Sequence, residues 1–285
     1  MAGPNALTPG PPLDTRDAPR ITAMPPMLSV TLPAYNEQEN LPKLIERAYE
    51  VLPRLVDDFE LIIVDDGSVD ATREVAMGLI ERHYPEVRLA VHEHNRGYGA
   101  AIRTGFAHAK GDLVFYTDSD NQFDLADLEH FLPLMDEWDL IVGFRVYRYD
   151  TVMRSFLSWV YNRIVRVLFR VRVRDVDCAF KLFRREVLEK ITIESDDFFV
   201  DAELVAKARK WNFRLLEKGV RHYPRAAGET TVRPSDIPET LRRIALMWKR
   251  IYFPGQDHLR HMASANAPEY APGAEVTPQT ELAGG

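Results

Sequence analysis

The first half of the chain alternates between short apolar runs and segments with a helical spacing of apolar positions. The apolar runs are rich in Val, Ile, Leu and Phe, and their continuity is typical of strands buried on both faces of a sheet. They predict five strands, at residues 27–33, 59–65, 87–92, 113–117 and 139–142. The segments between and after them predict helices at about residues 37–52, 70–83, 98–109 and 125–137.

Strands that alternate with helices indicate an α/β fold with a mostly parallel sheet and right-handed crossovers. Asp70 and Asp124 each stand at the start of a predicted helix, where an acidic side chain caps free N–H groups. In parallel sheets of this kind, ligands bind beyond the carboxyl ends of the strands. We therefore expect the functional residues just after the first, second and fourth strands.

Acidic residues gather at these strand ends. Asp65 and Asp66 end the second strand, and Asp118 and Asp120 follow the fourth. Residues i and i+2 of an extended segment point the same way, so Asp118 and Asp120 can both reach one Mg²⁺ or Mn²⁺ ion. Gln122 continues that face as a further candidate ligand. A turn that the two aspartates merely cap is the alternative, and the acids at the neighbouring strand end favour the metal site.

A glycine-rich segment, residues 95–105, opens the predicted helix after the third strand. It imitates a dinucleotide-binding loop, but that fingerprint belongs after the first strand, where this chain has no glycine. The start of the helix could face an anion through its free N–H groups. Close packing of its small residues is the alternative.

Composition narrows the class of protein. With 46% hydrophobic and 28% charged residues in 285, the chain is expected to be globular, apart from disordered tails at 1–26 and 263–285. The single cysteine, Cys178, excludes an intrachain disulfide and a multi-cysteine zinc site. The chain has no apolar secretory segment and no uncharged apolar run of about 18 residues. We therefore expect a cytoplasmic protein without a membrane-spanning helix.

The distribution of charge is more informative than the net value of −7, which disfavours nucleic-acid binding. Residues 145–174 carry eight arginines and a single acid, Asp150. A predicted helix at about 151–174 interleaves arginine with Trp, Tyr and Phe, a composition that suits an anionic membrane surface. A second amphipathic basic helix is predicted within 234–262. For both helices, packing onto the rest of the protein is the alternative.

Four segments, taken in order, resemble the successive signatures of family 2 glycosyltransferases of the GT-A fold: LPAYNEQENL, VDDGSVDAT, NRGYGAAIRTGF and DSDNQFD. The resemblance covers about residues 27–253 and implies a GT-A domain over 27–233. It also implies a nucleotide-diphosphate sugar as donor, with Mg²⁺ or Mn²⁺ on Asp118 and Asp120 bridging the diphosphate. The donor contacts that it implies are Pro33, Ala34, Tyr35, Glu37, Asp65, Asp66, Gly97, Asp118, Ser119 and Asp120.

The second half resembles the dolichyl- and polyprenyl-phosphate sugar transferases of this family, in particular the mannosyltransferases. The resemblance lies in residues 143–145, in residues 175–182, and in the R-x-x-x-S-x-x-x-N spacing that begins at Arg154. It implies a lipid-phosphate acceptor held by Arg145, Arg154, Ser158 and Lys181. Arginine also suits this role chemically, because its guanidinium group binds phosphate through two parallel hydrogen bonds.

The resemblance implies an inverting transfer of a hexose, with mannose from GDP-mannose as the best match, at the cytosolic face of a membrane. Asp118, Asp120 and Asp201 are the predicted catalytic residues. Because an ionised phosphate can attack the sugar without a protein base, Asp201 is either a base or a residue that orients Lys181 or an arginine. A surface helix or a membrane-anchoring partner would hold the enzyme at the bilayer.

Two other functions stay open. A soluble family 2 enzyme would use a UDP-sugar and a hydroxyl acceptor in polysaccharide or cell-envelope synthesis, with Asp201 as the base. A non-catalytic protein that binds nucleotide sugars or docks on membranes would keep the same fold.

Overall fold

The computed structural model describes residues 26–81, 84–147, 152–224 and 237–253, without the side chains of 152–156 and 237–239. The predicted tails lie outside the described residues, except for Pro26. The strands are β1 (Leu28–Ala34), β2 (Phe59–Asp65), β3 (Val87–Val91), β4 (Leu113–Thr117), β5 (Leu140–Arg145), β6 (Phe180–Arg184) and β7 (Leu215–Val220). The α-helices are α1 (Leu41–Val51), α2 (Thr72–Glu81), α3 (Tyr98–His108), α4 (Val152–Phe169), α5 (Arg185–Lys190), α6 (Val200–Lys210) and α7 (Ile237–Tyr252).

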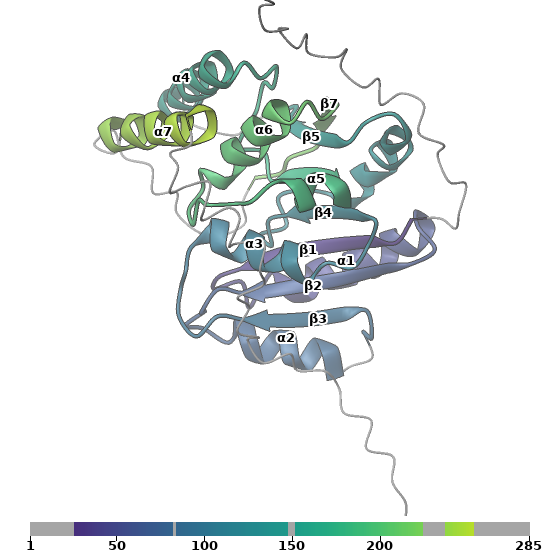
Figure 1. Ribbon diagram of the computed structural model, residues 1–285. Helices are drawn as coiled ribbons and strands as arrows, with labels where there is room; N and C mark the ends of the chain where they lie inside the picture. Colours follow the sequence, from purple (N-terminus) through teal and green to yellow (C-terminus); the bar gives the residue numbers. More distant parts are fainter. Residues whose placement is uncertain (1–25, 82–83, 148–151, 225–236, 254–285) are drawn as a thin grey trace, which may run out of the picture.

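All seven strands form one sheet in the order β3-β2-β1-β4-β6-β5-β7 (Figure 1). Its pairs are parallel except those of β6, which runs antiparallel to both β4 and β5. The five predicted strands are confirmed, and so is the mostly parallel sheet flanked by helices. Strands β6 and β7 were not predicted, because the charged positions within them hide the apolar pattern of a buried strand.

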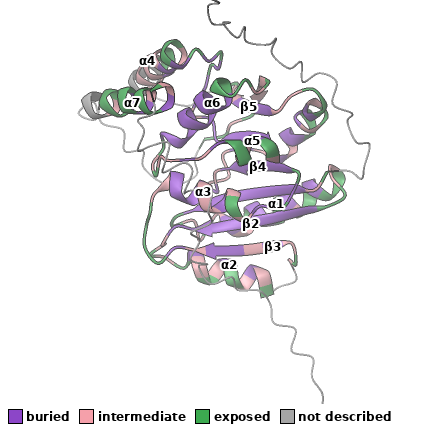
Figure 2. Cartoon of the chain, in the orientation of Figure 1, coloured by how far each residue is buried: buried purple, intermediate pink, exposed green. Residues whose placement is uncertain are grey.

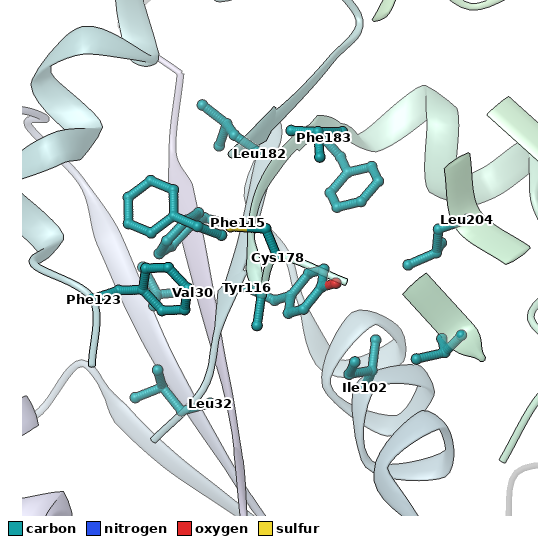
Figure 3. Packing of buried hydrophobic residues seen from close by; sticks show 14 of the residues in the cluster. Val30, Leu32, Ile102, Phe115, Tyr116, Phe123, Cys178, Leu182, Phe183 and Leu204 are labelled. Carbon is teal, nitrogen blue, oxygen red and sulfur yellow. The ribbon is translucent and has the colours of Figure 1, made fainter. Parts of the chain in front are cut away.

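Helices cover both faces of the sheet, so its central strands are buried throughout (Figure 2). Along β2, Leu61 and Ile63 belong to the main apolar cluster, whereas Ile62 and Val64 face the other way, into a smaller cluster with Ala101 of α3. Figure 3 shows how side chains of β1, β4, β6 and α3 interlock in the main cluster. This two-sided burial explains why these strands read as continuous apolar runs.

The predicted helix at 125–137 is instead two consecutive 3₁₀-helices, η3 (Leu125–His130) and η4 (Leu132–Asp136); a third short one, η2 (Leu52–Arg54), follows α1. Pro133 lies inside the predicted helix and lacks the N–H that one continuous α-helix would need there, so the chain is interrupted between η3 and η4. The predicted cap is confirmed, since Asp124 accepts a hydrogen bond from the N–H of Ala126 at 3.0 Å.

The two basic helices lie side by side at one end of the molecule, where α7 contacts both α4 and α6 (Figure 1). Helix α4 buries Val165 and Phe169, and α7 buries Ile244 and Ile251. Each helix therefore docks on the protein through one side and leaves its other side exposed. No helix among the described residues is long and apolar enough to cross a membrane.

A segment before α6 packs so closely on the start of α3 that only glycine fits there. A Cβ atom on Gly99 would lie 2.2 Å from the carbonyl oxygen of Ser195. We expect Gly99→Ala to lower the free energy of unfolding by about 1–3 kcal/mol, measured by chemical denaturation. Gly78→Ala in α2 is the matched control, because a Cβ atom there meets nothing within 4 Å. It should raise stability by about 0.5–1 kcal/mol, and equal effects of the two variants would contradict this packing.

Candidate active site

The ends of three neighbouring strands meet at one edge of the sheet. Ala34, at the end of β1, lies opposite Asp65, at the end of β2. On the other side of β1, the hydroxyl of Ser119 donates a hydrogen bond to the carbonyl oxygen of Pro33 at 2.8 Å. The structure thus brings together the segments in which the sequence predicted the donor site.

Asp65 and Asp66 are buried and have their partners inside the protein. Asp65 accepts hydrogen bonds from the N–H of Ser68 at 3.0 Å and from Nε of Arg73 at 3.2 Å. An oxygen of Asp66 lies 2.6 Å from Nδ1 of His92. These contacts fix the loops that border the predicted nucleotide site, and a direct contact of either carboxylate with the base stays a prediction.

Other groups of the protein already bind the free N–H groups at the start of α3. The carboxylate of Asp66 accepts the N–H groups of Arg96 and Gly97, both at 2.9 Å. The carbonyl oxygen of Asp196 accepts the N–H of Gly99 at 2.8 Å. Gly97 adopts a φ of +100°, which favours glycine. Because these N–H groups are already bonded, the geometry favours the packing role of the small residues over an anion site.

The loop after β1 is held by hydrogen bonds and has one aromatic side chain on its outside. The N–H of Glu37 donates to Thr72 Oγ1 at 2.8 Å, and its carboxylate accepts from Asn40 Nδ2 at 2.6 Å. Ala34 is buried, whereas Tyr35 is 44% exposed. The Tyr35 ring is therefore an accessible planar surface of this loop, and its contact with a base stays a prediction.

The geometry at Asp118 suits a cation. The hydroxyl of Tyr98 donates to one of its oxygens at 2.7 Å. Burial, and next the charge of Asp120, raise the pKa of Asp118 to about 7. A nearby cation would relieve both effects, and two carboxylates offer the oxygen ligands that Mg²⁺ and Mn²⁺ prefer.

An ion bound to Asp118 and Asp120 must take its remaining ligands largely from groups other than acidic side chains. The described residues contain no group of three or more His, Cys, Asp or Glu that could hold a metal. Nε2 of Gln122 donates to the carbonyl oxygen of Tyr223 at 2.9 Å, which leaves Oε1 as the atom that could meet a metal or its water. Water and substrate phosphates complete such shells around Mg²⁺.

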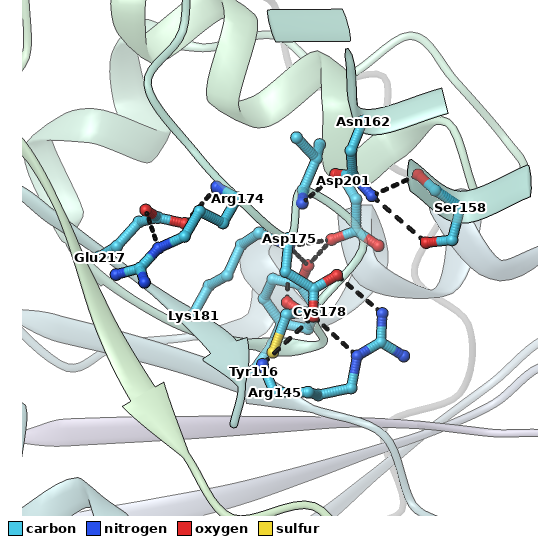
Figure 4. Close-up of polar contacts among 11 residues, drawn as sticks. Tyr116, Arg145, Ser158, Asn162, Arg174, Asp175, Cys178, Lys181, Asp201 and Glu217 are labelled. Atoms are coloured by element: carbon cyan, nitrogen blue, oxygen red, sulfur yellow. Dashed lines mark hydrogen bonds and ion pairs between the residues drawn. The ribbon is translucent and has the colours of Figure 1, made fainter. Parts of the chain in front are cut away.

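Lys181 and Asp201 form a buried ion pair behind this edge (Figure 4). Nζ of Lys181 donates to Asp201, to the Tyr116 hydroxyl at 2.9 Å and to the carbonyl oxygen of Cys178 at 2.8 Å. These three bonds use the three protons of the ammonium group. This contact is compatible with Asp201 orienting Lys181, one of its two predicted roles; that role and a contact of Lys181 with an acceptor phosphate stay predictions.

The other predicted acceptor residues gather around β5 and α4 (Figure 4). Arg145 donates from Nε at 2.8 Å and from Nη2 at 2.7 Å to the carboxylate of Asp175, which leaves Nη1 for another acceptor. Ser158 lies on α4, where Nδ2 of Asn162 donates to its carbonyl oxygen at 2.8 Å. Arg154 belongs to α4, but its side chain lies outside the described residues.

A model of the family described as glycosyl transferase family 2 matches residues 29–192, which is more than half of the chain. The chain belongs to glycosyl transferase family 2. Several named relatives act on polyprenyl phosphates, so the predicted resemblance is confirmed at the level of the family.

Three relatives show the range of similarity of this family 2 glycosyltransferase. Glycosyltransferase AglD of Haloferax volcanii is 33% identical over 240 residues, covering 78% of this chain and 37% of that protein. The dolichyl-phosphate beta-glucosyltransferase of Dictyostelium discoideum is 29% identical, covering 68% and 65%. The dodecaprenyl-phosphate galacturonate synthase of Rhizobium johnstonii is 29% identical, covering 79% and 67%. This chain therefore spans between about a third and about two thirds of their lengths.

Solved structures confirm the GT-A fold. Glucosyl-3-phosphoglycerate synthase from Mycobacterium tuberculosis, crystallised with Mn²⁺, UDP and glucosyl-3-phosphoglycerate, superposes with a TM-score of 0.58 at 19% identity, covering 81% of this chain and 82% of that one. The same enzyme with phosphoglyceric acid gives a TM-score of 0.59 at 20% identity, with the same coverage.

Four further side chains of this glycosyltransferase form hydrogen bonds with the predicted site residues. The sequence did not single them out. Tyr98 holds Asp118, His92 holds Asp66, Tyr116 joins the Lys181 network, and Asp175 holds Arg145. Tyr98 stands in a segment quoted for the family resemblance, and Asp175 opens another. Their partners lie far away in sequence, so only the folded structure reveals these pairs.

The buried pair predicts a large effect on the stability of this glycosyltransferase. Lys181→Met leaves Asp201 as an uncompensated buried charge and should lower the free energy of unfolding by about 3–5 kcal/mol in chemical denaturation. Adding Asp201→Leu should recover part of this loss. Arg214→Ala breaks the more exposed pair with Asp139 and should cost no more than about 1 kcal/mol. A small loss in Lys181→Met would show that the lysine is not needed by Asp201.

Proposed function

We propose that this glycosyltransferase moves a hexose from a nucleotide-diphosphate sugar to the phosphate of a polyprenyl lipid, with inversion at the sugar carbon and dependence on Mg²⁺ or Mn²⁺. The observation that carries the donor half is the half-buried Asp118 beside Asp120, with a raised pKa, at the meeting point of three strand ends. The acceptor half is supported by relatives named for polyprenyl and dolichyl phosphates.

The chain's own residues suit a direct displacement. An oxygen of the acceptor phosphate forms the new bond to the anomeric carbon while the bond to the diphosphate breaks, and the nucleoside diphosphate leaves. A divalent ion on Asp118 and Asp120 would stabilise the charge on this leaving group. An ionised phosphate needs no base, which agrees with Asp201 being engaged by Lys181 and Tyr116.

The identity of the transferred sugar is the most specific part of the proposal. Mannose from GDP-mannose remains our choice, because the acceptor segments resemble the mannosyltransferases of the family. The named relatives transfer other sugars, among them glucose, galacturonate and 4-deoxy-4-formamido-L-arabinose. A UDP-sugar with a hydroxyl acceptor is the second candidate, and it is supported by the similar fold of glucosyl-3-phosphoglycerate synthase with UDP. That reaction needs a free base, and the ion pair of Asp201 argues against it.

We further propose that the protein sits on the cytosolic face of a membrane through α4 and α7. Large apolar side chains stay exposed on both helices or next to them, with Trp159 58% exposed, Val167 61% and Phe253 63%. Exposed basic residues alternate with them, namely Arg163, Arg170, Arg242, Lys249 and Arg250. Apolar and cationic side chains on one surface suit anionic lipid. An anchoring partner protein would serve the same purpose.

The reaction is tested with radiolabelled nucleotide sugars and polyprenyl phosphate, following counts in the organic phase. We expect label from GDP-mannose in the lipid, and its loss with a metal chelator. Asp120→Asn should lower turnover at least about 100-fold and weaken Mn²⁺-dependent binding of the nucleoside diphosphate in calorimetry. Asp136→Asn, at an exposed acid of η4, is the control. Full turnover in chelator would refute the metal site.

The membrane proposal is tested by flotation with liposomes. Binding should require anionic lipid and fall as salt rises from about 0.05 to 0.5 M, because salt screens exposed charges. The double variant Trp159→Ser and Val167→Ser should float less. Val69→Ser removes an apolar side chain that is 83% exposed in the loop after β2, and it should float like the unchanged protein. No flotation at any lipid charge or salt concentration would favour a soluble enzyme.

A further inference from the structure

Two buried polar atoms near the acceptor residues have no hydrogen-bond partner among the described residues. They are the hydroxyl oxygen of Tyr161, on α4, and Oδ1 of Asp177, in the segment that leads to β6. Leaving such an atom unpaired costs about 1–3 kcal/mol, and native proteins keep few of them. A pair of them in one place therefore indicates a site that a ligand completes.

The pair lies beside the predicted acceptor residues. Tyr161 lies one helical turn after Ser158, on the same side of α4. Asp177 follows Asp175 by two residues, and Asp175 holds the guanidinium group of Arg145 (Figure 4). The two unpaired atoms thus adjoin residues to which the proposed function assigns the acceptor phosphate.

The charges around Asp177 come from four other parts of the fold. Asp201 faces it from α6, Lys181 from β6 and Arg145 from β5, with Asp175 in its own segment and Tyr161 on α4. Lys181 and Arg145 are each paired with one of the other aspartates. Asp177 is therefore the acid of this group without a cation of its own among the described residues.

Both unpaired groups stay uncharged more readily than in water. Burial, and next the charges of Asp201 and Asp175, raise the pKa of Asp177 to about 7. Burial, and next the charge of Asp177, raise the pKa of Tyr161 well above its usual value. Near neutral pH the pair can thus present two O–H donors, one from the phenol and one from the carboxylic acid.

We propose that Asp177 and Tyr161 form an acceptor subsite, in which the neutral carboxylic acid and the phenol donate hydrogen bonds to the phosphate group of the acceptor. This inference rests on the proposed function. Once Asp177 is ionised, its carboxylate repels the phosphate, so that binding of the phosphate takes up a proton at alkaline pH. A hydroxyl acceptor would need the opposite state, because only the ionised carboxylate can accept its proton.

The first test compares pH profiles of kcat/KM for polyprenyl phosphate. In the unchanged enzyme we expect a fall above about pH 7 that approaches tenfold per pH unit, because the neutral form of Asp177 disappears. Asp177→Asn should lose this fall, and the ratio of the two profiles removes the ionisation of the acceptor itself. Tyr161→Phe should raise KM roughly three- to tenfold, since one hydrogen bond is lost. Glu189→Gln, at an exposed acid of α5, is the control for changes of surface charge.

The second test needs no folded variant. Farnesyl phosphate is titrated into the unchanged protein at pH 8 in two buffers of different ionisation heat, which counts the protons exchanged. We expect an uptake of close to one proton for each phosphate bound. An exchange of close to zero protons would overturn the proposal.

The outcomes separate this subsite from the proposed function. If Asp177→Asn transfers sugar to the lipid phosphate with the unchanged pH profile, the subsite is refuted and the function stands. If kcat/KM of the unchanged enzyme rises with pH and Asp177→Asn loses turnover, Asp177 is a base and the subsite is refuted. If the unchanged enzyme transfers no sugar to a polyprenyl phosphate at any pH, the proposed function fails.

Discussion

Negative charge held inside the protein, at the carboxyl edge of the sheet, is the constraint on which the rest of the structure depends. Asp65, Asp66 and Asp118 follow strands that are buried on both faces, so bulk water does not stabilise their charges. Asp65 and Asp66 find donors in nearby loops. Asp118 receives one bond from Tyr98 and has Asp120 beside it, which leaves a place where a cation is favourable.

On the acceptor side, cationic side chains of the protein itself neutralise the buried carboxylates. Arg145 on β5 pairs with Asp175, and Lys181 on β6 pairs with Asp201 on α6. Because β6 lies between β4 and β5, these pairs connect the donor edge to α6 and to the segment between α4 and β6. Breaking either pair would leave a buried charge, so they hold the proposed acceptor site in one geometry. Asp177 stands beside both pairs without a cation among the described residues, and this asymmetry makes it sensitive to the charge of a ligand.

Local sequence signals were sufficient to predict a strand or helix wherever that element has its own pattern of apolar residues. Every end of the five strands with continuous apolar runs was predicted to within three residues, and so were both ends of the helix that begins at Tyr98. Strand β6 was missed because Lys181 and Arg184 interrupt its apolar residues. Its lysine can be fully buried only because Asp201, which is 20 residues away in sequence, neutralises it. Pro133 interrupts the α-helix predicted at 125–137.

The sequence by itself determined the α/β class, the sheet edge at which the acidic residues gather and the aspartates that we propose as metal ligands. These follow from local periodicity and from the rule that the carboxyl ends of parallel strands share one edge. Only the tertiary structure decided the partners of those residues: that Asp66 and a backbone carbonyl close the start of α3, that Lys181 points inward, and that the Tyr161 hydroxyl and Oδ1 of Asp177 have no hydrogen-bond partner among the described residues. The physical reason is that the stability of a buried charge or donor depends on groups brought near it by folding, which the neighbouring sequence does not reveal.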